Sequence, residues 1–263
     1  MRTVIVIPAR YASTRYPGKP LVMLRDREGV AKSLIQRSWE AAMAVRGADA
    51  VYVATDDDRI RAAAQAFGAQ VIMTSETCEN GTARCAEAAL AGRFKADLVV
   101  NLQGDAPLTP AWFVEDLIAA MAASPEAGVA TPVVQCDAQT YAHFRADRAA
   151  GLVGGTTAVF DARHRALYFS KEVLPYIHPD KAADAAGEVF HHVGLYAYRP
   201  AALAQYASWP EGRLERHEGL EQLRFLENGV DVLCVEVEGR GRIFWELNNP
   251  GDVARIESIL NAA

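Results

Sequence analysis

The stretch TVIVIPARYASTRYPGK (residues 3–19) joins a short apolar run to a turn that is rich in positive charge. Residues 3–8 are apolar on both faces of the expected strand, as in parallel sheets that are covered by helices on each side. The turn contains Arg10, Arg15 and Lys19 together with Pro17 and Gly18. The stretch therefore predicts a buried strand that ends in a cationic turn.

The rest of the first half repeats this alternation of apolar runs with helical patterns of 3.6-residue period. Further strands are expected at 50–55, 69–74 and 96–105, and helices at 29–45, 57–68, 81–92 and from Thr109-Pro110 to about Met121. Gly68 and Gly92 lie where helix C-caps are expected. Repeated strand–helix–strand spacing predicts an α/β fold with a mostly parallel sheet flanked by helices.

The second half of the chain has a different texture. Antiparallel or mixed strands are expected within 154–171 and 188–200 around a loose insert, then an amphipathic helix at 214–229, a strand at 230–237 and a closing helix at 250–263. We find no linker, internal repeat or low-complexity segment. One domain spanning residues 1–263 is predicted, with a smaller mixed or antiparallel sheet extension at about 150–212.

Composition narrows the class of function. Lys and Arg number 27 against 33 Asp and Glu, a formal net charge of −6, which argues against a nucleic-acid or anionic-membrane surface. The four cysteines form no CxxC pair and are expected to be reduced and buried. No apolar run reaches transmembrane length. A soluble, cytoplasmic protein with no nucleic-acid or membrane partner is predicted.

The cationic turn is the first candidate site. Neither GxxxxGK[ST] nor GxGxxG occurs, yet two guanidiniums and an ammonium beyond a strand end suit the oxygens of a polyphosphate. The alternative is a solvated loop whose cations cluster by chance. The prolines and the position after a parallel strand favour the binding interpretation, because ligands of such sheets collect beyond the carboxyl ends of the strands.

Other polar segments follow later strands. NLQGDAP (101–107) places Asp105 at a strand end, where its carboxylate suits a Mg²⁺ ion or merely an Asx-turn. Asp56 in ATDDD (54–58) and Asn80 in ENGTAR (79–84) are placed either to cap the next helix or to help read a base edge.

Taken together, these motifs resemble a known family. PARYASTRYPGKPL, ATDD, NGTAR, NLQGDAPL, ALYFSKEVLPY, HHVGLYAYR and RHEGLEQLRFLENG occur in the order found in 3-deoxy-manno-octulosonate (Kdo) cytidylyltransferases, over nearly the whole chain. The resemblance implies a Rossmann-like sheet of the nucleotide-diphospho-sugar transferase type, Mg²⁺ as cofactor and a homodimer formed through the mixed-sheet region. It implies attack by the anomeric hydroxyl of a keto-sugar acid on the α-phosphorus of CTP, with release of pyrophosphate.

Carried over residue by residue, the resemblance implies three groups of contacts. The nucleotide group comprises Ala9, Arg10, Ser13, Arg15, Lys19, Ala54, Thr55, Asp56, Asn80, Gly81, Thr82, Arg84 and Gln103. The sugar-acid group comprises Lys171, His192, Tyr196, Glu221 and Gln222. Arg10, Lys19 and Asp105 would be catalytic, and Asp105 and Asn248 would hold the metal. Such catalysis works by positioning and charge neutralisation.

Some of these residues also have structural interpretations. Lys171 could cap a following helix, and strand alternation turns only one of His191 and His192 inward. Glu221 and Gln222 could be the polar face of an amphipathic helix.

The sequence departs from the family pattern in four places. The stretch LNNPGD (247–252) has Asn248 where the family usually has an aspartate that binds a second metal ion, so that ion binds weakly or Glu246 or Asp252 substitutes. Thr157 replaces a lysine, and Lys171 and His191 replace arginines. A lysine lacks the two-pronged grip of an arginine on a carboxylate.

Three of the four departures fall on the sugar-acid side, which leaves three hypotheses. The first is activation of Kdo itself, and the second is activation of another acidic acceptor, such as a modified Kdo, a nonulosonic acid or a phosphonate. The third is a catalytically silent regulator that binds nucleotide.

Overall fold

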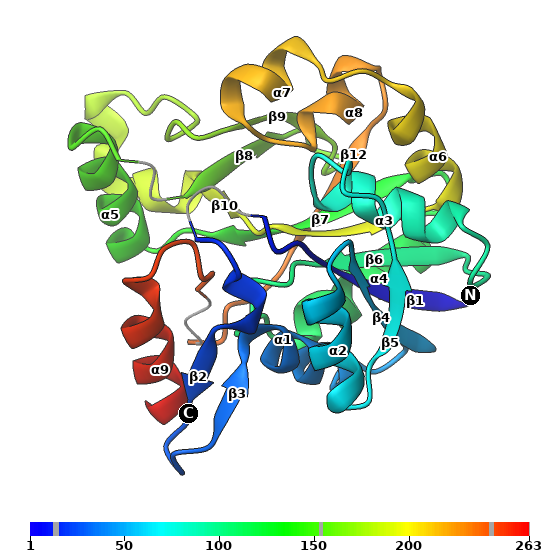
Figure 1. Cartoon of the computed structure of the whole chain (residues 1–263). Coiled ribbons are helices and arrows are strands. Elements are labelled where there is room, and N and C mark those ends of the chain that lie inside the picture. The colour runs from blue at the N-terminus through cyan, green and yellow to red at the C-terminus, as the bar shows by residue number, and fades with distance from the viewer. Residues whose placement is uncertain (13–15, 153–154, 242–244, 263) are drawn as a thin grey trace.

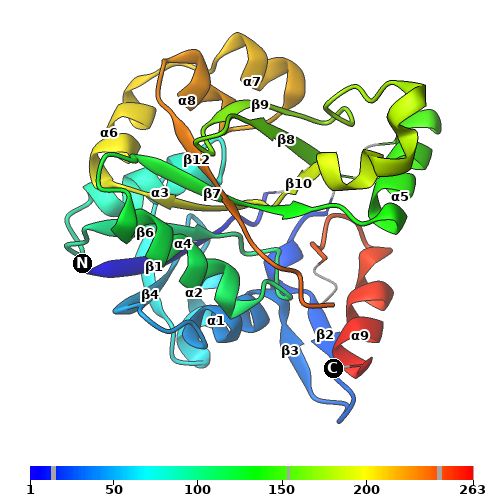
Figure 2. The same ribbon diagram turned by 180° about the vertical axis from the view of Figure 1, so that it is seen from behind.

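The computed structural model describes residues 1–12, 16–152, 155–241 and 245–262, and in this part of the chain ten strands form one large sheet (Figures 1 and 2). The strand order is β5-β4-β1-β6-β11-β7-β10-β8-β9, with β12 beside β7. The strands are β1 (Thr3–Ala9), β4 (Ala50–Thr55), β5 (Gln70–Met73), β6 (Leu98–Leu102), β7 (Val129–Gln135), β8 (Thr156–Phe160), β9 (Ala166–Ser170), β10 (Phe190–His192), β11 (Leu195–Tyr198) and β12 (Val232–Glu236).

The sheet changes character along its length. Strands β5, β4, β1 and β6 are parallel, and β11 then inserts antiparallel between β6 and β7. Beyond β7, the strands β10, β8 and β9 pair antiparallel, whereas β12 runs parallel to β7. The predicted α/β class with a mixed extension is therefore confirmed, and the extension continues the same sheet.

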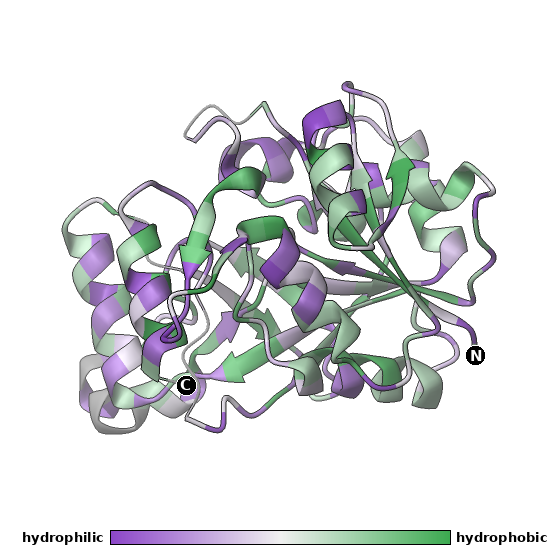
Figure 3. Ribbon diagram, turned by 60° about the horizontal axis from the view of Figure 1, so that its bottom comes forward, coloured by the Kyte–Doolittle hydropathy of each residue, from purple (hydrophilic) through white to green (hydrophobic). Residues whose placement is uncertain are grey.

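Helices cover both faces of the sheet. They are α1 (Leu34–Met43), α2 (Asp58–Ala66), α3 (Gly81–Leu90), α4 (Ala111–Ala123), α5 (Ala138–Ala149), α6 (Pro200–Ser208), α7 (Arg213–Glu218), α8 (Leu223–Glu227) and α9 (Asp252–Ala262). One apolar core joins the sheet to α3, α6 and α8, and a second joins its other face to α1, α2 and α4. Figure 3 shows the resulting pattern, with hydrophobic strands inside and hydrophilic patches on the helices outside.

Strand β1 explains why the layers form. All seven of its residues are buried, and they alternate between the cores, with Val4 and Val6 on the α3 face and Ile5 and Ile7 on the α1 face. At about 25 cal/mol for each Å² of apolar surface removed from water, such a strand is stable only between two covering layers.

A pair of short strands and two 3-10 helices lie outside the large sheet. Strands β2 (Met23–Arg25) and β3 (Ala31–Ser33) form an antiparallel pair that contacts α9, as Figure 1 shows. The 3-10 helix η1 (Lys19–Leu21) lies at the end of the cationic turn. The 3-10 helix η2 (Pro179–Glu188) lies in the predicted loose insert. In the described residues, no helix is both long and apolar enough to cross a membrane.

Several predicted boundaries are wrong. The helix expected at 29–45 begins at Leu34, because Ser33 caps it by accepting a hydrogen bond from the Gln36 amide at 3.3 Å and residues 31–33 are a strand. The helix expected at 214–229 is two helices, because Gly219 adopts a left-handed conformation between α7 and α8. Helix α4 begins after Pro110, which is itself the N-cap.

Candidate active site

The carboxyl ends of β1, β4 and β6 meet at one edge of the sheet, as expected for parallel neighbours. Ala9 of β1 lies in register with Thr55 of β4, and both are buried. After β6 the chain passes so close to β1 that a Cβ atom on Gly104 would lie 2.6 Å from the carbonyl oxygen of Pro8. Only glycine permits this approach, which brings Asp105 beside the loop that follows β1.

Lys19 and Asp105 form an ion pair at this edge. The Lys19 Nζ atom lies 2.5 Å from Asp105 Oδ2, and the two side chains are 15% and 26% exposed. Lys19 begins η1 directly after Gly18, whose φ of 71° needs a glycine. Lys19 and Asp105, both in the predicted catalytic group, are thus in contact, and both remain accessible from solvent.

Arg10 connects this loop to the start of α3. Its side chain is exposed, and its Nη1 atom lies 3.4 Å from the carbonyl oxygen of Glu79. Ser13 and Arg15, both in the predicted nucleotide group, lie outside the described residues.

The end of β4 faces an arginine that is fixed on several sides. Arg84 is 2% exposed and donates hydrogen bonds to Thr74 Oγ1 at 2.5 Å and to Asp56 Oδ2 at 3.2 Å. The other carboxylate oxygen of Asp56 is buried without a partner among the described residues. Asp56 and Arg84, both in the predicted nucleotide group, are therefore in contact, and Ala54 and Thr55 beside Asp56 in the chain are buried.

The first turn of α3 is built from predicted nucleotide residues. Asn80 is the N-cap of α3, and its Oδ1 atom accepts a hydrogen bond from the Ala83 amide at 2.8 Å. A Cβ atom on Gly81 would lie 2.8 Å from Gln103 Nε2, so the turn touches the side chain that follows β6. The Thr82 hydroxyl lies 2.7 Å from that of Tyr198.

Glu221, of the predicted sugar-acid group, forms hydrogen bonds with this first turn of α3 and with Gln103. Its carboxylate accepts hydrogen bonds from the Thr82 amide at 3.1 Å and from Gln103 Nε2 at 3.4 Å. Burial raises the pKa of Glu221. Because a carboxylate only accepts hydrogen bonds, Gln103 must turn its amide nitrogen toward Glu221.

The other acceptor-side residues lie around Glu221. The Tyr196 hydroxyl donates to Gln222 Oε1 at 3.0 Å, and Gln222 Nε2 is buried without a partner in the described part of the chain. Lys171 is half-buried, and its Nζ atom lies 2.9 Å from where a Cβ atom on Gly219 would be.

His192 belongs to the core on this side of the sheet. It is 6% exposed, its Nε2 atom lies 3.0 Å from the Thr131 hydroxyl, and its ring packs against Phe169 and Tyr196. Burial lowers its pKa to about 3, so the ring is neutral at pH 7. The structural interpretation of this histidine explains its surroundings fully.

The donor set around Asp105 fits a hard divalent cation. Its Oδ1 atom accepts no hydrogen bond from the described residues, and its backbone oxygen accepts one from the Leu247 amide at 2.9 Å, which brings Glu246 and Asn248 nearby in the chain. Carboxylate and amide oxygens of this kind suit Mg²⁺, which keeps several waters and few protein ligands. The described residues contain no cluster of three or more potential metal ligands.

One of the two alternative metal ligands is already occupied. Asp252 accepts hydrogen bonds from the amides of Asn248 and Asn249 and from the Trp245 indole, at 2.7–3.0 Å. It therefore holds the loop before α9. The Glu246 carboxylate points toward Gly194, 3.2 Å from where a Cβ atom would be.

Comparison with known proteins covers the whole site. The sequence model of the family described as "Cytidylyltransferase" matches residues 4–232. The 3-deoxy-manno-octulosonate cytidylyltransferase of Maricaulis maris (strain MCS10) is 42% identical over 262 residues, covering 100% of this chain and 98% of that relative. That of Escherichia coli is 40% identical over 240 residues, covering 91% of this chain and 89% of the relative.

This chain belongs to the 3-deoxy-manno-octulosonate cytidylyltransferase family. The solved structure of CMP:2-keto-3-deoxy-manno-octonic acid synthetase complexed with CTP matches with a TM-score of 0.83 and 36% identity, covering 99% of this chain and 98% of that one. The inositol-1-phosphate CTP transferase from T. maritima shares the fold, with a TM-score of 0.64 and 11% identity over 99% of this chain and 95% of that one.

The site of this cytidylyltransferase contains a residue that the sequence analysis missed. Asn101 on β6 is fully buried, and neither polar atom of its side chain has a partner among the described residues. It points to the same face of the sheet as Gln103, and its Nδ2 atom lies 3.3 Å from where a Cβ atom on Gly81 would be. An asparagine in an otherwise apolar strand run, two residues before Gln103, was the available signal.

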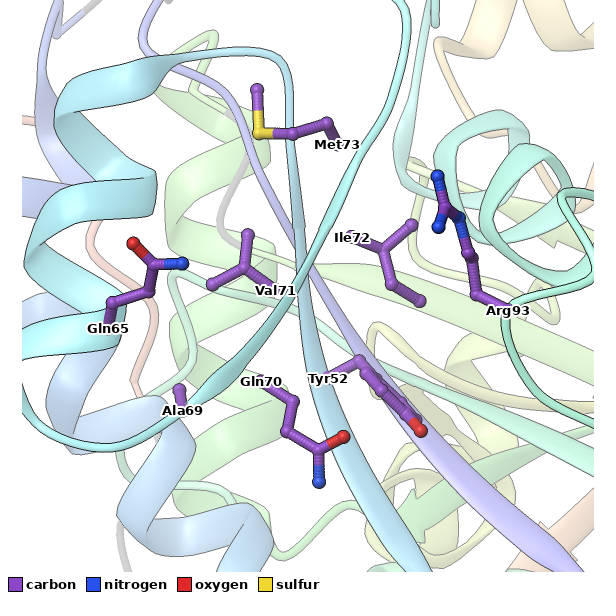
Figure 4. Close-up of a pocket in the computed structure, with 8 residues that line it drawn as sticks. All are labelled: Tyr52, Gln65, Ala69, Gln70, Val71, Ile72, Met73 and Arg93. Carbon is purple, nitrogen blue, oxygen red and sulfur yellow. The ribbon is translucent and has the colours of Figure 1, made fainter.

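A surface depression of this cytidylyltransferase lies away from the strand ends. Figure 4 shows it around the edge strand β5, with a volume of about 450 Å³ and a lining that includes Tyr52, Gln70, Met73 and Arg93. It contains none of the predicted site residues, and it brings no acid, base or nucleophile together. We therefore assign the active site to the strand ends.

Proposed function

We propose that this protein transfers CMP from CTP to the anomeric hydroxyl of Kdo and releases pyrophosphate, with Mg²⁺ as its cofactor. The observation that carries the proposal is the Lys19–Asp105 pair at the shared ends of β1 and β6. It joins the cation that suits a phosphate to the carboxylate that suits a metal, in a chain 42% identical to a named Kdo cytidylyltransferase.

Each part of the site has a role in this proposal. Lys19 and Arg10 hold the triphosphate and offset its charge, the first turn of α3 and the Asp56–Arg84 pair hold the cytidine, and Gln103 lies toward the reacting phosphate. Mg²⁺ held by Asp105, with Asn248 or Glu246 nearby, would neutralise phosphate charge. Holding two reactants in line in a preorganised site supplies most of the rate in such reactions.

The direct test is release of pyrophosphate. Purified protein with CTP, Mg²⁺ and Kdo should release pyrophosphate in step with formation of CMP-Kdo, and omission of Kdo should abolish the release. Removal of Mg²⁺ with a chelator should stop turnover, and added Mg²⁺ should restore it. Binding of CTP without turnover on any sugar acid would instead favour the silent regulator, although the family's members are named as enzymes.

A second acceptor remains a specific alternative. Lys171 offers one point charge where an arginine would grip a carboxylate with two nitrogens. Thr157 has a structural task, since its hydroxyl donates to the carbonyl oxygen of Glu172 at 2.7 Å and accepts from the Leu174 amide at 3.2 Å. A panel of Kdo, modified Kdo, nonulosonic acids and phosphonates would rank kcat/KM, and full activity on ordinary Kdo would exclude the alternative.

We also propose a homodimer in the cytoplasm. Leu167 on β9 and Tyr176 in the following loop are 62% and 80% exposed, and an apolar surface of this kind on the sheet extension suits burial by a second copy. Light scattering after size-exclusion chromatography should give twice the 28.5 kDa chain mass. Charged substitutions at Leu167 and Tyr176 should halve it.

A further inference from the structure

We propose that Tyr206 is a positioning residue, which fixes the first turn of α3 and thereby the affinity for CTP. The inference rests on the proposed function, because it concerns the same nucleotide pocket. Tyr206 lies on α6, is fully buried and belongs to none of the predicted contact groups. Its ring packs in the core at 5.1 Å from that of Phe225, while its hydroxyl reaches the N-terminus of α3.

The hydroxyl completes the hydrogen bonds of Asn80. Asn80 Nδ2 donates to the Tyr206 oxygen at 2.8 Å, and Asn80 Oδ1 accepts from the Ala83 amide at 2.8 Å. Both ends of the amide are therefore engaged, which fixes its rotamer and its orientation. Asn80 shapes the pocket by starting α3 in one place, and the backbone of Gly81 and Thr82 follows from it.

Tyr206 is itself held from the far side. Its hydroxyl donates to Glu215 Oε1 at 3.3 Å, and Arg224 grips the same carboxylate with Nε at 2.6 Å and Nη2 at 2.7 Å. The Glu215 and Arg224 side chains are 6% and 5% exposed, so this pair is screened from water. The Arg224 guanidinium also lies 4.3 Å from the centre of the Tyr206 ring.

The carboxylates of Glu215 and Glu221 therefore both hold the first turn of α3 in place. Glu215 acts on Asn80 mainly through Tyr206, with a longer direct hydrogen bond from Asn80 Nδ2 to Glu215 Oε1 at 3.5 Å. Glu221 accepts a hydrogen bond from the Thr82 amide at 3.1 Å. The apolar core already holds α3 against α6, so the hydroxyl of Tyr206 adds direction rather than packing. A pocket that already has its bound shape loses less conformational entropy when its ligand binds.

The test is the Tyr206→Phe variant, which keeps the ring and removes one oxygen. Titration calorimetry with CTP and Mg²⁺ should give a Kd raised by about 3- to 10-fold, the range expected for one hydrogen bond. At saturating CTP, kcat should stay within about 2-fold of wild type, and the KM for the sugar acid should not change. The Kd for CTP should rise more than any loss of stability, measured as Tm, would explain.

Val232→Ala is the matched control for stability. Val232 is fully buried in the same core, on β12, and its side chain has no polar atom that could hold Asn80. This variant should lower Tm yet leave the Kd for CTP unchanged. If Tyr206→Phe lowers Tm and leaves the Kd for CTP at the wild-type value, the proposal is overturned.

A double-mutant cycle keeps the proposal testable if either effect is small. Asn80→Ser retains a good N-cap but loses the amide that meets Tyr206. Adding Tyr206→Phe to Asn80→Ser should raise the Kd for CTP little further, because the shared hydrogen bond is already gone. Fully additive effects would contradict the proposal. Since CTP binding is measured without an acceptor, a wild type that binds CTP but does not turn over Kdo disproves the function and leaves this test intact.

Discussion

Lys19 shows how much one side chain can matter while contributing little to folding. Its ion pair with Asp105 is partly open to solvent, and such pairs stabilise a fold by about 0–1 kcal/mol. In the reaction the same ammonium meets developing phosphate charge in a site prepared for it. We expect Lys19→Ala to lower kcat by about 100- to 1000-fold, as removal of one preorganised donor does, with Tm nearly unchanged.

Lys32→Ala is the matched control for that loss. Lys32 is also a half-exposed lysine in an ion pair, with its Nζ atom 2.9 Å from Glu40 Oε2, but it lies on β3 away from the strand ends. Pyrophosphate-release kinetics should distinguish the two variants clearly. Equal turnover in both would remove Lys19 from the catalytic group.

Asn101, unlike Lys19, is expected to lower the stability of the fold. A fully buried amide whose polar atoms have no partner in the described part of the chain costs about 1–3 kcal/mol, and a β-branched residue suits this interior strand position. Asn101→Val should therefore raise the free energy of unfolding by about that amount, measured by urea denaturation. It should also lower kcat/KM, because the amide lies beside Gly81 and faces the same way as Gln103. A loss of stability would show that Asn101 is satisfied by water.

At this scale the sequence predicted residues that contact each other. Lys19 meets Asp105 and Asp56 meets Arg84 near the ends of parallel strands, and Glu221, between α7 and α8, meets Thr82. The sequence could not reveal that the Asn101 amide lacks a partner among the described residues, nor the role of Tyr206. Both depend on which atoms remain unsatisfied or meet across helices, and such contacts form only in the assembled fold.

Among the elements, the break between α7 and α8 is the most informative. Gly219 has a φ of 63°, and a Cβ atom there would lie 2.9 Å from Lys171 Nζ. Gly219→Ala should cost about 1–2 kcal/mol for the left-handed backbone. It should also push the Lys171 ammonium away and raise the KM for the sugar acid several-fold.

Gly229→Ala separates these two effects. Gly229 follows α8 with a φ of 73°, and a Cβ atom there would have nothing within 4 Å. The backbone cost is then similar, while Lys171 stays where it is. Chemical denaturation should show similar losses of stability in the two variants, and acceptor kinetics should differ only for Gly219→Ala. An unchanged KM in both would place Lys171 outside the acceptor site.

Element prediction succeeded where local signals are strong. The range of β4 is as predicted, and Gly68 and Gly92 end their helices with positive φ. Strand β7 was missed altogether, although it pairs with β10, β11 and β12. It contains Pro132, which cannot donate to a ladder and so conceals a strand inside a sheet.

For the whole molecule, the single sheet explains why nucleotide and acceptor residues meet. Strand β11 lies between β6 and β7, so the parallel half and the mixed half share one core. Tyr196 on β11 lies in register with Asn101 on β6. The predicted extension therefore forms a wall of the site, which neither half could complete alone.

Stability of the whole fold should depend on pH through this shared core. Burial lowers the pKa of His192 to about 3, below its ordinary value of 6.5. Between pH 6.5 and pH 3 this histidine is protonated in the unfolded chain but stays neutral in the folded protein. The stability that is present above pH 6.5 is therefore lost as the pH falls toward 3. Well below pH 6.5, one such histidine contributes a slope of about 1.4 kcal/mol per pH unit.

Substitution can assign that slope to one side chain. His192→Gln removes the titrating ring, so the free energy of unfolding should fall less steeply between pH 6.5 and pH 4.5 than in wild type, even if its value at pH 7.5 is lower. His143→Gln, at a side chain that is 51% exposed, should keep the wild-type slope. Urea denaturation at four pH values measures all three slopes. Parallel curves for wild type and His192→Gln would mean that the folded protein binds a proton at His192, and with it that the sheet opens to water around β10.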